Sequence, residues 1–233
     1  NAQYISCYDT ARLIPDFTAH VVPYSTTDLR GYKRPTFTSD EGPCAPNPQS
    51  VAADIRKPGG KPGEYFCSKG HLTPSAAFDT EAERNLTFKM TNVAPQWQKF
   101  NGQNWAKVEE AVKEYVKAKK TDLYVFTGTA GTSTYQASTV KTVIPTHYWK
   151  AVCDPVAKQS IFFIAENNVG DKSTKKLNSP SCFNMQMTEE NGVVECKSIT
   201  QAAAQYSQVP DFHPFNCGTN KKGTFLEQYL DFL

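Results

Sequence analysis

Side chains that can carry hydrolytic chemistry gather between residues 67 and 109. His71 comes first, and Asn92, Asn101 and Glu109 follow it around the start of a predicted helix. An imidazole with its ordinary pKa of about 6.5 can accept a proton from water near neutral pH. An asparagine oxygen suits a hard cation such as Mg²⁺, which keeps most of its own waters. The stretch therefore predicts a metal-assisted hydrolase, with the base at a strand end and the metal ligand on a neighbouring helix.

Each of these residues also has a plain structural interpretation. His71 could cap a loop, Asn101 stands where a helix N-cap would, and Glu109 could be a solvated helix residue. Cys67 lies four residues before His71, which leaves open a cysteine–histidine nucleophilic pair, although Cys67 also fits half of a disulfide. The chain has four histidines and lacks H-E-x-x-H, Walker and Rossmann patterns. These absences argue against a multi-histidine zinc enzyme and a nucleotide-binding fold.

One amphipathic helix is predicted immediately after Asn101. Apolar residues recur at three- and four-residue spacing from Trp105 to Val116, and lysines crowd the C-terminal end. If the helix includes Asn101, Glu109 follows eight residues later, roughly 80° around and about 12 Å along the axis. The two side chains would then face the same cleft.

Strands are predicted on both sides of this helix. The β-prone runs before it are residues 4–8, 17–24 and 87–92, the last broken by Pro95-Gln96, and those after it are 123–127, 140–144, 148–152 and 161–165. A loop is expected at 128–132 and a short helix within 198–207. His20 alternates with apolar neighbours and is interpreted as a structural histidine. Because strands outnumber helices, we expect a single α+β domain over residues 1–233, with a mainly antiparallel central sheet flanked by helices.

The charge balance permits a nucleic-acid partner without arguing for one. The formal net charge is +2, from 25 Lys and Arg against 23 Asp and Glu. A local basic patch matters more than this total. Such a patch is offered by the loop-rich segment 31–63 and the residue before it, with Arg30, Lys33, Arg34, Arg56, Lys57 and Lys61. This segment is either a solvated basic loop or a phosphate-contacting surface that leads into the site.

The cysteines and a sequon favour a secreted protein. The seven cysteines are scattered, with no C-x-x-C pair, so up to three disulfides are expected with one cysteine left over. Asn85-Leu86-Thr87 is an N-glycosylation sequon. A start at Asn1 without a signal-peptide apolar region is what a processed form would show. No apolar run approaches the roughly 20 residues of a membrane span. A cytosolic protein with free thiols is the alternative.

Three ordered motifs resemble those of the DNA/RNA non-specific endonucleases of the ββα-metal superfamily. Residues 69–74 (KGHLTP) resemble D-R-G-H-x-x-P, and residues 91–96 (TNVAPQ) resemble S-N-x-x-P-Q. Residues 100–109 (FNGQNWAKVE) resemble x-N-x-G-x-W-x-x-L-E, with the glycine displaced by one residue. Residues 123–128 and 144–150 look like later strands of the family. The resemblance runs from Tyr4 to Phe215. The chain looks like a secreted, cysteine-containing, animal-type member of this family. The resemblance implies a ββα-metal motif at the active site.

The resemblance implies a role for each matched residue. His71 matches the general base that activates water. Asn101 matches the ligand of a single Mg²⁺, whose other ligands are waters and phosphate oxygens. Glu109 matches the acidic residue that holds the metal's waters, and Asn92 matches a supporting asparagine near the site.

Basic residues complete the implied site. Arg34 is matched to an upstream arginine that stabilises the transition-state phosphate, with Arg30 as the alternative. Lys69 stands in place of the family's arginine, so it keeps the positive charge but loses the bidentate fork. Ser68 stands in place of the family's aspartate and removes a carboxylate. Lys69 and Arg30 are expected to bind substrate.

The implied function is a secreted endonuclease that hydrolyses phosphodiester bonds of DNA, with RNA as a further substrate, and leaves 5′-phosphate ends. Mg²⁺ is the implied cofactor, and Mn²⁺ or Ca²⁺ are candidate substitutes. Backbone-centred contacts predict cleavage with little dependence on sequence. One alternative is a catalytically silent protein on the same fold that binds nucleic acid or another extracellular partner, which Ser68 and the modest net charge support. The other is a cysteine-dependent hydrolase at Cys67.

Overall fold

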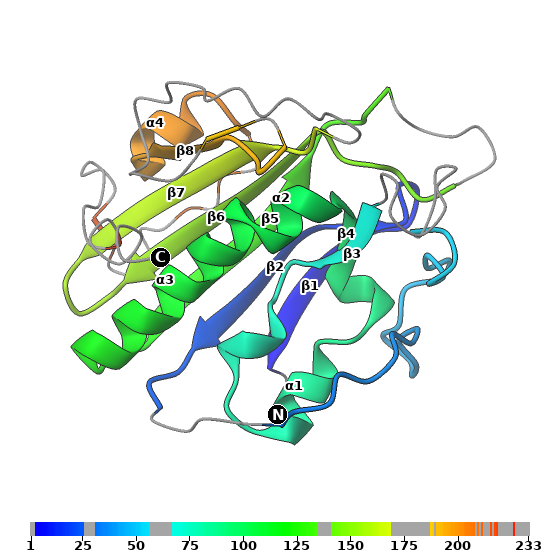
Figure 1. Cartoon of the computed structure of the whole chain (residues 1–233), viewed down its shortest axis with the longest axis horizontal. Helices are drawn as coiled ribbons and strands as arrows, with labels where there is room; N and C mark the ends of the chain where they lie inside the picture. The colour runs from blue at the N-terminus through cyan, green and yellow to red at the C-terminus, as the bar shows by residue number, and fades with distance from the viewer. Residues whose placement is uncertain are drawn as a thin grey trace.

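A six-stranded antiparallel sheet forms the frame of the molecule, in the order β1-β2-β5-β6-β7-β8 (Figure 1). The computed structural model describes residues 3–25, 31–55, 67–134, 141–168, 187–188, 190–207, 209, 211, 215, 217–218 and 226. The strands are β1 (Tyr4–Asp9), β2 (Ile14–Val22), β5 (Leu123–Ala130), β6 (His147–Asp154), β7 (Gln159–Glu166) and β8 (Val194–Lys197). Each neighbouring pair is antiparallel.

The central strands are buried on both faces because helices cover the sheet from two sides. Alternate residues of a strand point to opposite faces. Tyr148 and Val152 of β6 therefore pack in the main core with α3 (Asn104–Lys119). Trp149 and Ala151 point the other way, into a second cluster that includes Ile199 and Ala202 of α4 (Ile199–Ala203).

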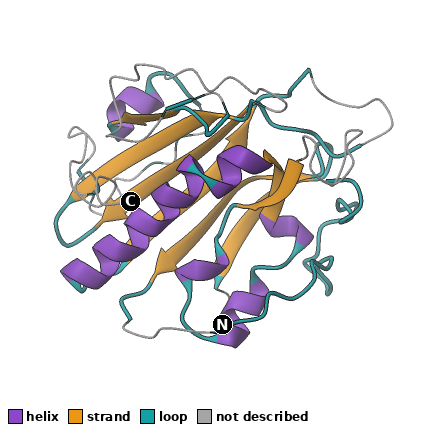
Figure 2. Ribbon diagram, in the orientation of Figure 1, coloured by secondary structure: helices purple, strands orange, loops and turns teal. Residues whose placement is uncertain are grey.

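Helix α3 lies lengthwise across one face of the sheet (Figure 2). Its buried residues recur every three or four positions, as the sequence predicts: Asn104, Trp105, Val108, Ala111, Val112, Tyr115 and Val116. The helix ends at Lys120, whose left-handed backbone (φ 54°) caps the last turn through a hydrogen bond from its N–H to the carbonyl of Val116.

A separate two-stranded sheet pairs β3 (Cys67–His71) with β4 (Val93–Trp97). The segment between these strands holds η1 (Ser75–Ala77), α1 (Glu81–Leu86) and η2 (Met90–Asn92), and α2 (Gln98–Gly102) follows β4 directly. A Cβ atom on Gly70 would lie 2.2 Å from Oε1 of Gln96, so only glycine permits this close approach of the strands. The antiparallel register places the start of β3, at Cys67 and Ser68, beside the end of β4 and α2, and places His71 beside the start of β4.

The structure confirms the predicted α+β class and corrects three local predictions. The strand expected at 87–92 is wrong, because Met90–Asn92 forms a 3₁₀ turn and the strand begins at Val93. Pro95 lies inside that strand, opposite Lys69, and a two-stranded pair tolerates a proline because each strand has an open edge. No strand forms at 141–144, while Val140 lies outside the described residues. β5 continues to Ala130, where a loop had been expected from Gly128.

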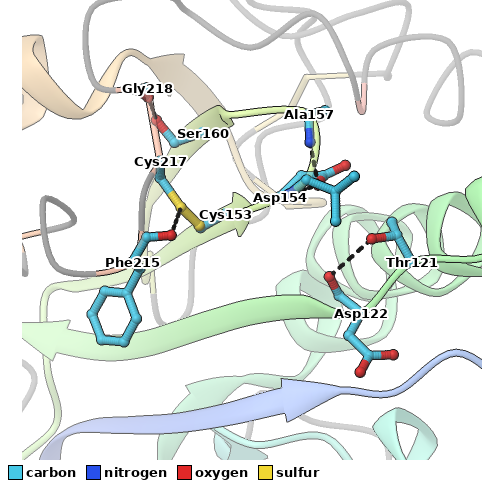
Figure 3. Close-up of a disulfide and its surroundings, with 10 residues drawn as sticks. Thr121, Asp122, Cys153, Asp154, Ala157, Ser160, Phe215, Cys217 and Gly218 are labelled. Atoms are coloured by element: carbon cyan, nitrogen blue, oxygen red, sulfur yellow. Dashed lines mark hydrogen bonds between the residues drawn. A yellow bond between two sulfur atoms is a disulfide. The ribbon is translucent and has the colours of Figure 1, made fainter.

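One disulfide joins Cys153 of β6 to Cys217 in the C-terminal segment (Figure 3). Cys196 is also disulfide-bonded. Cys7, Cys44 and Cys67 carry free thiols, so the seven cysteines form at most two disulfides, not three. The prediction of Cys67 as half of a disulfide is wrong. Its thiol packs in the interior, and burial raises its pKa to about 12, which also argues against a nucleophilic role.

Among the described helices, none has the length and apolarity that crossing a lipid bilayer requires.

Candidate active site

His71 is the last residue of β3, and its ring is enclosed by aromatic side chains. The ring centroid lies 5.0 Å from that of Phe37 and 4.9 Å from that of Phe88, and the residue is only 8% exposed. Its Nε2 atom is buried and has no hydrogen-bond partner. Burial, and then the positive charge of Arg34, lower the pKa of His71 to about 3. The imidazole is therefore neutral at working pH, and the same lowering makes it a weaker proton acceptor than an ordinary histidine.

Asn92 fixes the chain just after His71. Its Oδ1 accepts a hydrogen bond from the N–H of Thr73 at 2.9 Å, and its Nδ2 donates to the carbonyls of Thr73 and Thr87 at 2.9 and 2.8 Å. The side chain is fully buried. Asn92 therefore holds the turn that follows His71, and its role in the site stays a prediction. The hydroxyl of Thr73 lies 3.3 Å from Nδ1 of His20, which is buried and structural as predicted.

Asn101 lies in α2 and contacts the residue that replaces the family's aspartate. Its Nδ2 donates to Oγ of Ser68 at 2.9 Å, and Ser68 donates to the carbonyl of Gln96 at 3.2 Å. This arrangement leaves Oδ1 of Asn101 as the atom that can bind a cation. The prediction of Asn101 as an N-cap is wrong, because α3 begins after Gln103 and has no side-chain cap.

The predicted relation of Asn101 to Glu109 along one helix is also wrong. A break at Gln103 (φ −118°, ψ −105°) separates α2 from α3, so the two residues stand on successive helices. Glu109 is partly buried and lines a small pocket that residues of α3, β2, β5 and β6 also line. Burial raises its pKa to about 7, and the positive charges of Lys150 and Arg34 oppose this rise. The positive charge of Arg34 thus acts on both His71 and Glu109.

Cations near His71 are held against aromatic rings. The guanidinium carbon of Arg34 lies 5.3 Å from the ring centroid of Phe88, and Nζ of Lys69 lies 5.7 Å from that of Phe37. Each contact fixes a long side chain that would otherwise move freely. The structure therefore brings Arg34 and Lys69 to the ring cluster that encloses His71. Arg30 lies outside the described residues, and its substrate-binding role stays a prediction.

Two further cations, Arg84 and Lys150, were not identified from the sequence. The guanidinium carbon of Arg84 lies 5.4 Å from the ring centroid of Tyr32, and the hydroxyl of Tyr32 donates to Oδ1 of Asn85 at 2.9 Å. Asn85, the sequon residue, is exposed on α1. The signal available for Arg84 in the sequence was a basic residue directly before the sequon. Lys150 was missed as well, although a lysine inside the apolar run 148–152 is itself an unusual feature.

The donor set fits a hard cation better than zinc. Within the part of the chain that the structure describes, no three His, Cys, Asp or Glu side chains gather into a metal-binding group. Mg²⁺ needs no such group, because it keeps several waters and binds through one or two protein oxygens. Asn101 provides a neutral oxygen whose orientation Ser68 fixes, and Glu109 is the acid on the next helix.

A two-stranded pair that ends in a histidine and runs into helices, set against a mainly antiparallel sheet, defines an α+β nuclease of the ββα-metal type. A family model described as DNA/RNA non-specific endonuclease matches residues 1–212, and the chain belongs to this family.

Two relatives that the chain matches in sequence are nucleases by name. The chain is 33% identical over 112 residues to a salivary endonuclease of Lutzomyia longipalpis, covering 44% of this chain and 27% of that protein. It is 28% identical over 203 residues to Nuclease C1 of Cunninghamella echinulata var. echinulata, covering 80% and 76% of the two chains. The chain thus spans little more than a quarter of the salivary relative.

A solved structure shares the fold. One chain of the crystal structure of the EndoG/EndoGI complex aligns with a TM-score of 0.53 at 19% identity, covering 75% of this chain and 76% of that one. At this identity the likeness supports the α+β fold alone.

Proposed function

We propose that the chain is a secreted, sugar-non-specific endonuclease that hydrolyses phosphodiester bonds in DNA and RNA with one Mg²⁺ and leaves 5′-phosphate ends. One observation carries the proposal. A neutral, buried histidine with a free Nε2 stands beside Arg34, and Asn101 and Glu109 lie on the two helices that follow the paired strand. The family match supports action on nucleic acids.

The protein's own residues account for the proton and charge transfers. His71 accepts a proton from the attacking water, which a neutral imidazole can do. The charge of Arg34 stabilises the negative charge that builds on the phosphate, and its contact with Phe88 holds the guanidinium in place beforehand. Lys69, on the strand that carries the base, adds a second positive charge for the phosphate backbone.

Asn101 and Glu109 are the residues that would hold Mg²⁺ and its waters. When bound, Mg²⁺ neutralises the scissile phosphate and stabilises charge on the leaving 3′ oxygen. Ser68 keeps the amide of Asn101 turned so that its oxygen is free. Mn²⁺ is a closer substitute than Ca²⁺, because Ca²⁺ prefers more ligands at longer distances than a single asparagine and waters supply.

Secretion is supported by two features of the chain and by the names of two relatives. A disulfide joins Cys153 to Cys217, and Cys196 is bonded as well. The sequon residue Asn85 is exposed and accessible to a glycan. Two relatives are salivary by name, from Lutzomyia longipalpis and Glossina morsitans morsitans. Disulfides and sequons are typical of oxidising, extracellular compartments.

Digestion of supercoiled plasmid and of a structured RNA by purified protein tests the function. We expect Mg²⁺-dependent cleavage that EDTA abolishes, and a loss of about 10²- to 10⁴-fold in His71→Ala. DNA binding by His71→Ala, measured in EDTA by fluorescence anisotropy, should persist. His147→Ala serves as the matched histidine control, because that residue starts β6 and lines a different pocket.

The outcomes separate the candidate functions. Cleavage that continues without metal would refute the one-metal mechanism, and full activity of His71→Ala would refute the assignment of the base. Folded wild type that binds DNA without cutting it would favour the silent member of the fold. End-labelling of the products distinguishes 5′-phosphate from 3′-phosphate ends.

A further inference from the structure

The loop of residues 32–38 runs alongside α1 and the residues that follow it. At one end of the loop, the hydroxyl of Tyr32 donates to Oδ1 of Asn85 in α1 at 2.9 Å. At the other end, the N–H of Thr38 donates to the carbonyl of Phe88 at 3.1 Å. The loop is therefore held at both ends against the same segment of the chain.

A row of cations lies over aromatic rings along this loop. The contacts are Lys69 with the ring of Phe37, Arg34 with that of Phe88, and Arg84 with that of Tyr32, at 5.7, 5.3 and 5.4 Å from the ring centroids. The rings of Phe37 and Phe88 also enclose His71. Arg84 therefore continues, along the loop and α1, a series of positive charges that begins beside His71.

Arg84 is held in place before any ligand binds. Its Nε donates to the carbonyl of Phe78 at 2.8 Å, and its guanidinium carbon lies over the ring of Tyr32. Within the part of the chain that the structure describes, no carboxylate pairs with Arg84 and its two terminal nitrogens donate to no group. The side chain is only half-buried. A guanidinium fixed in this way presents its terminal N–H groups to an anion, and its planar fork matches a phosphate.

The charges around Tyr32 show that the two arginines share one neighbourhood. Burial raises the pKa of Tyr32, the charges of Arg84 and Arg34 oppose this rise, and Glu81 adds to it. The other acid in the first turn of α1, Glu83, is engaged, because it accepts hydrogen bonds from the backbone and hydroxyl of Thr80 at 3.2 and 2.8 Å. Glu81 is thus the acid that opposes anion binding here, against two arginines.

We propose that Arg84 binds a second backbone phosphate of the nucleic-acid substrate, one that the enzyme does not cleave, and that the ring of Tyr32 positions its guanidinium for this contact. The proposal rests on the proposed function for the identity of the ligand. A nucleic-acid strand carries a phosphate at every nucleotide, so a strand whose scissile phosphate meets Arg34 has further phosphates on either side. Arg84 lies outside the three motifs that carry the family resemblance.

The salt dependence of DNA binding tests the contact. Affinity for a duplex is measured by fluorescence anisotropy in EDTA, over a range of salt concentrations, in the His71→Ala background. Adding Arg84→Gln should weaken binding about tenfold at low salt, because a charge-assisted hydrogen bond is lost. The slope of log affinity against log salt concentration should become shallower by about 0.9 unit, as the loss of one phosphate contact predicts. An unchanged slope would overturn the proposal.

Arg12→Gln is the matched control, because it removes the same charge elsewhere. Arg12 follows β1 and pairs with Asp16 at 3.1 Å. Its replacement should leave the slope unchanged, and a change as large as that in Arg84→Gln would overturn the proposal by pointing to total charge. Glu81→Gln removes the opposing acid and should strengthen binding.

Substrate length gives a second readout, which a purely structural role of Arg84 would not alter. A dinucleoside monophosphate contains the scissile phosphate alone, whereas longer oligonucleotides also supply a second phosphate. With Mg²⁺, the ratio of kcat/KM between wild type and Arg84→Gln should be near one for the shortest oligonucleotides that are cut, and should rise with length to a plateau. Arg34→Gln should lower kcat/KM at every length. A ratio for Arg84→Gln that is the same at every length would refute the second-phosphate contact.

The proposed function and the role of Arg84 fail in different ways. If the protein binds DNA without cutting it, the proposed function fails, and the salt series still decides the contact of Arg84. If the protein cuts DNA and Arg84→Gln leaves the slope unchanged, only the role of Arg84 fails. A protein that binds no nucleic acid would refute both.

A second variant covers the case in which Arg84→Gln does not fold, although α1 buries none of its own residues. Tyr32→Leu removes the ring under the guanidinium and leaves every charge in place. DNA affinity should then fall by a smaller factor than in Arg84→Gln, and an unchanged affinity would count against the proposal.

Discussion

Lowering the pH should destabilise the protein through His71, and the size of the effect can be worked out. The unfolded chain binds a proton at His71 below its ordinary pKa of 6.5, but the folded protein does so only near pH 3. Stability from this residue is therefore complete above pH 6.5 and is lost as the pH falls toward 3. At pH 5, which is 1.5 pH units below the unfolded value, the loss is about 2 kcal/mol.

Urea denaturation followed by tryptophan fluorescence, in EDTA at pH 7.5 and pH 5, measures this loss. Other groups titrate in the same range, and Glu109, whose folded pKa is raised, acts in the opposite direction. The comparison is therefore made with His71→Gln, in which those contributions remain. We expect the unfolding free energy of wild type to fall by about 2 kcal/mol more than that of His71→Gln between the two pH values.

An equal fall in the two proteins would refute the reasoning. It would mean that His71 binds its proton as readily in the folded protein as in the unfolded chain. The enclosure by Phe37 and Phe88 would then not persist in solution. His20→Gln offers an independent repeat, because His20 is also buried with a lowered pKa.

Three further predictions concern other parts of the structure. Cys153→Ser should lower the unfolding free energy by about 4 kcal/mol in urea, because the bridge to Cys217 spans 64 residues, and an unchanged value would contradict its structural role. Ser68→Ala should raise the Mg²⁺ concentration for half-maximal activity about tenfold, since Asn101 loses its orienting contact, whereas an unchanged requirement would refute that contact's role. Arg34→Gln in the His71→Ala background should weaken the salt dependence of DNA binding, so that the slope of log affinity against log salt concentration changes by about one unit. An unaltered slope would mean that Arg34 does not contact a phosphate.

Elements with a strong local pattern could be predicted from the sequence. The spacing from Trp105 to Val116 defines α3, and the apolar runs define β5, β6 and β7. His71 was identified because an ordered motif surrounds it. Residues 87–92 misled the prediction because their alternation is local, whereas Asn92 is held in a 3₁₀ turn by the backbone of Thr73 on a distant segment.

The parts of the site that depend on distant contacts could not be predicted. Arg34 lies in an irregular loop, and only the fold brings it to the ring of Phe88 beside His71. Lys150 and Glu109 line the same pocket because β6 and α3 pack against each other across the core. The hydrogen bond from Asn101 to Ser68 joins two residues that are 33 positions apart in the sequence. These contacts between distant parts of the chain leave no periodicity or spacing in the sequence from which they could be predicted.

The serine at position 68 changes the electrostatic potential at the entrance to the site. The family motif carries an aspartate and an arginine before its glycine and histidine, which cancel in charge. This chain carries a serine and a lysine, and the imidazole beside them is neutral. The strand that carries His71 is therefore one elementary charge more positive than the family motif. A hydrogen bond from Asn101 to the Ser68 hydroxyl, and not a contact with a carboxylate, orients the Asn101 side chain. A polyanion approaching this strand meets no like charge from it, and the attraction is screened by salt as any such long-range steering is.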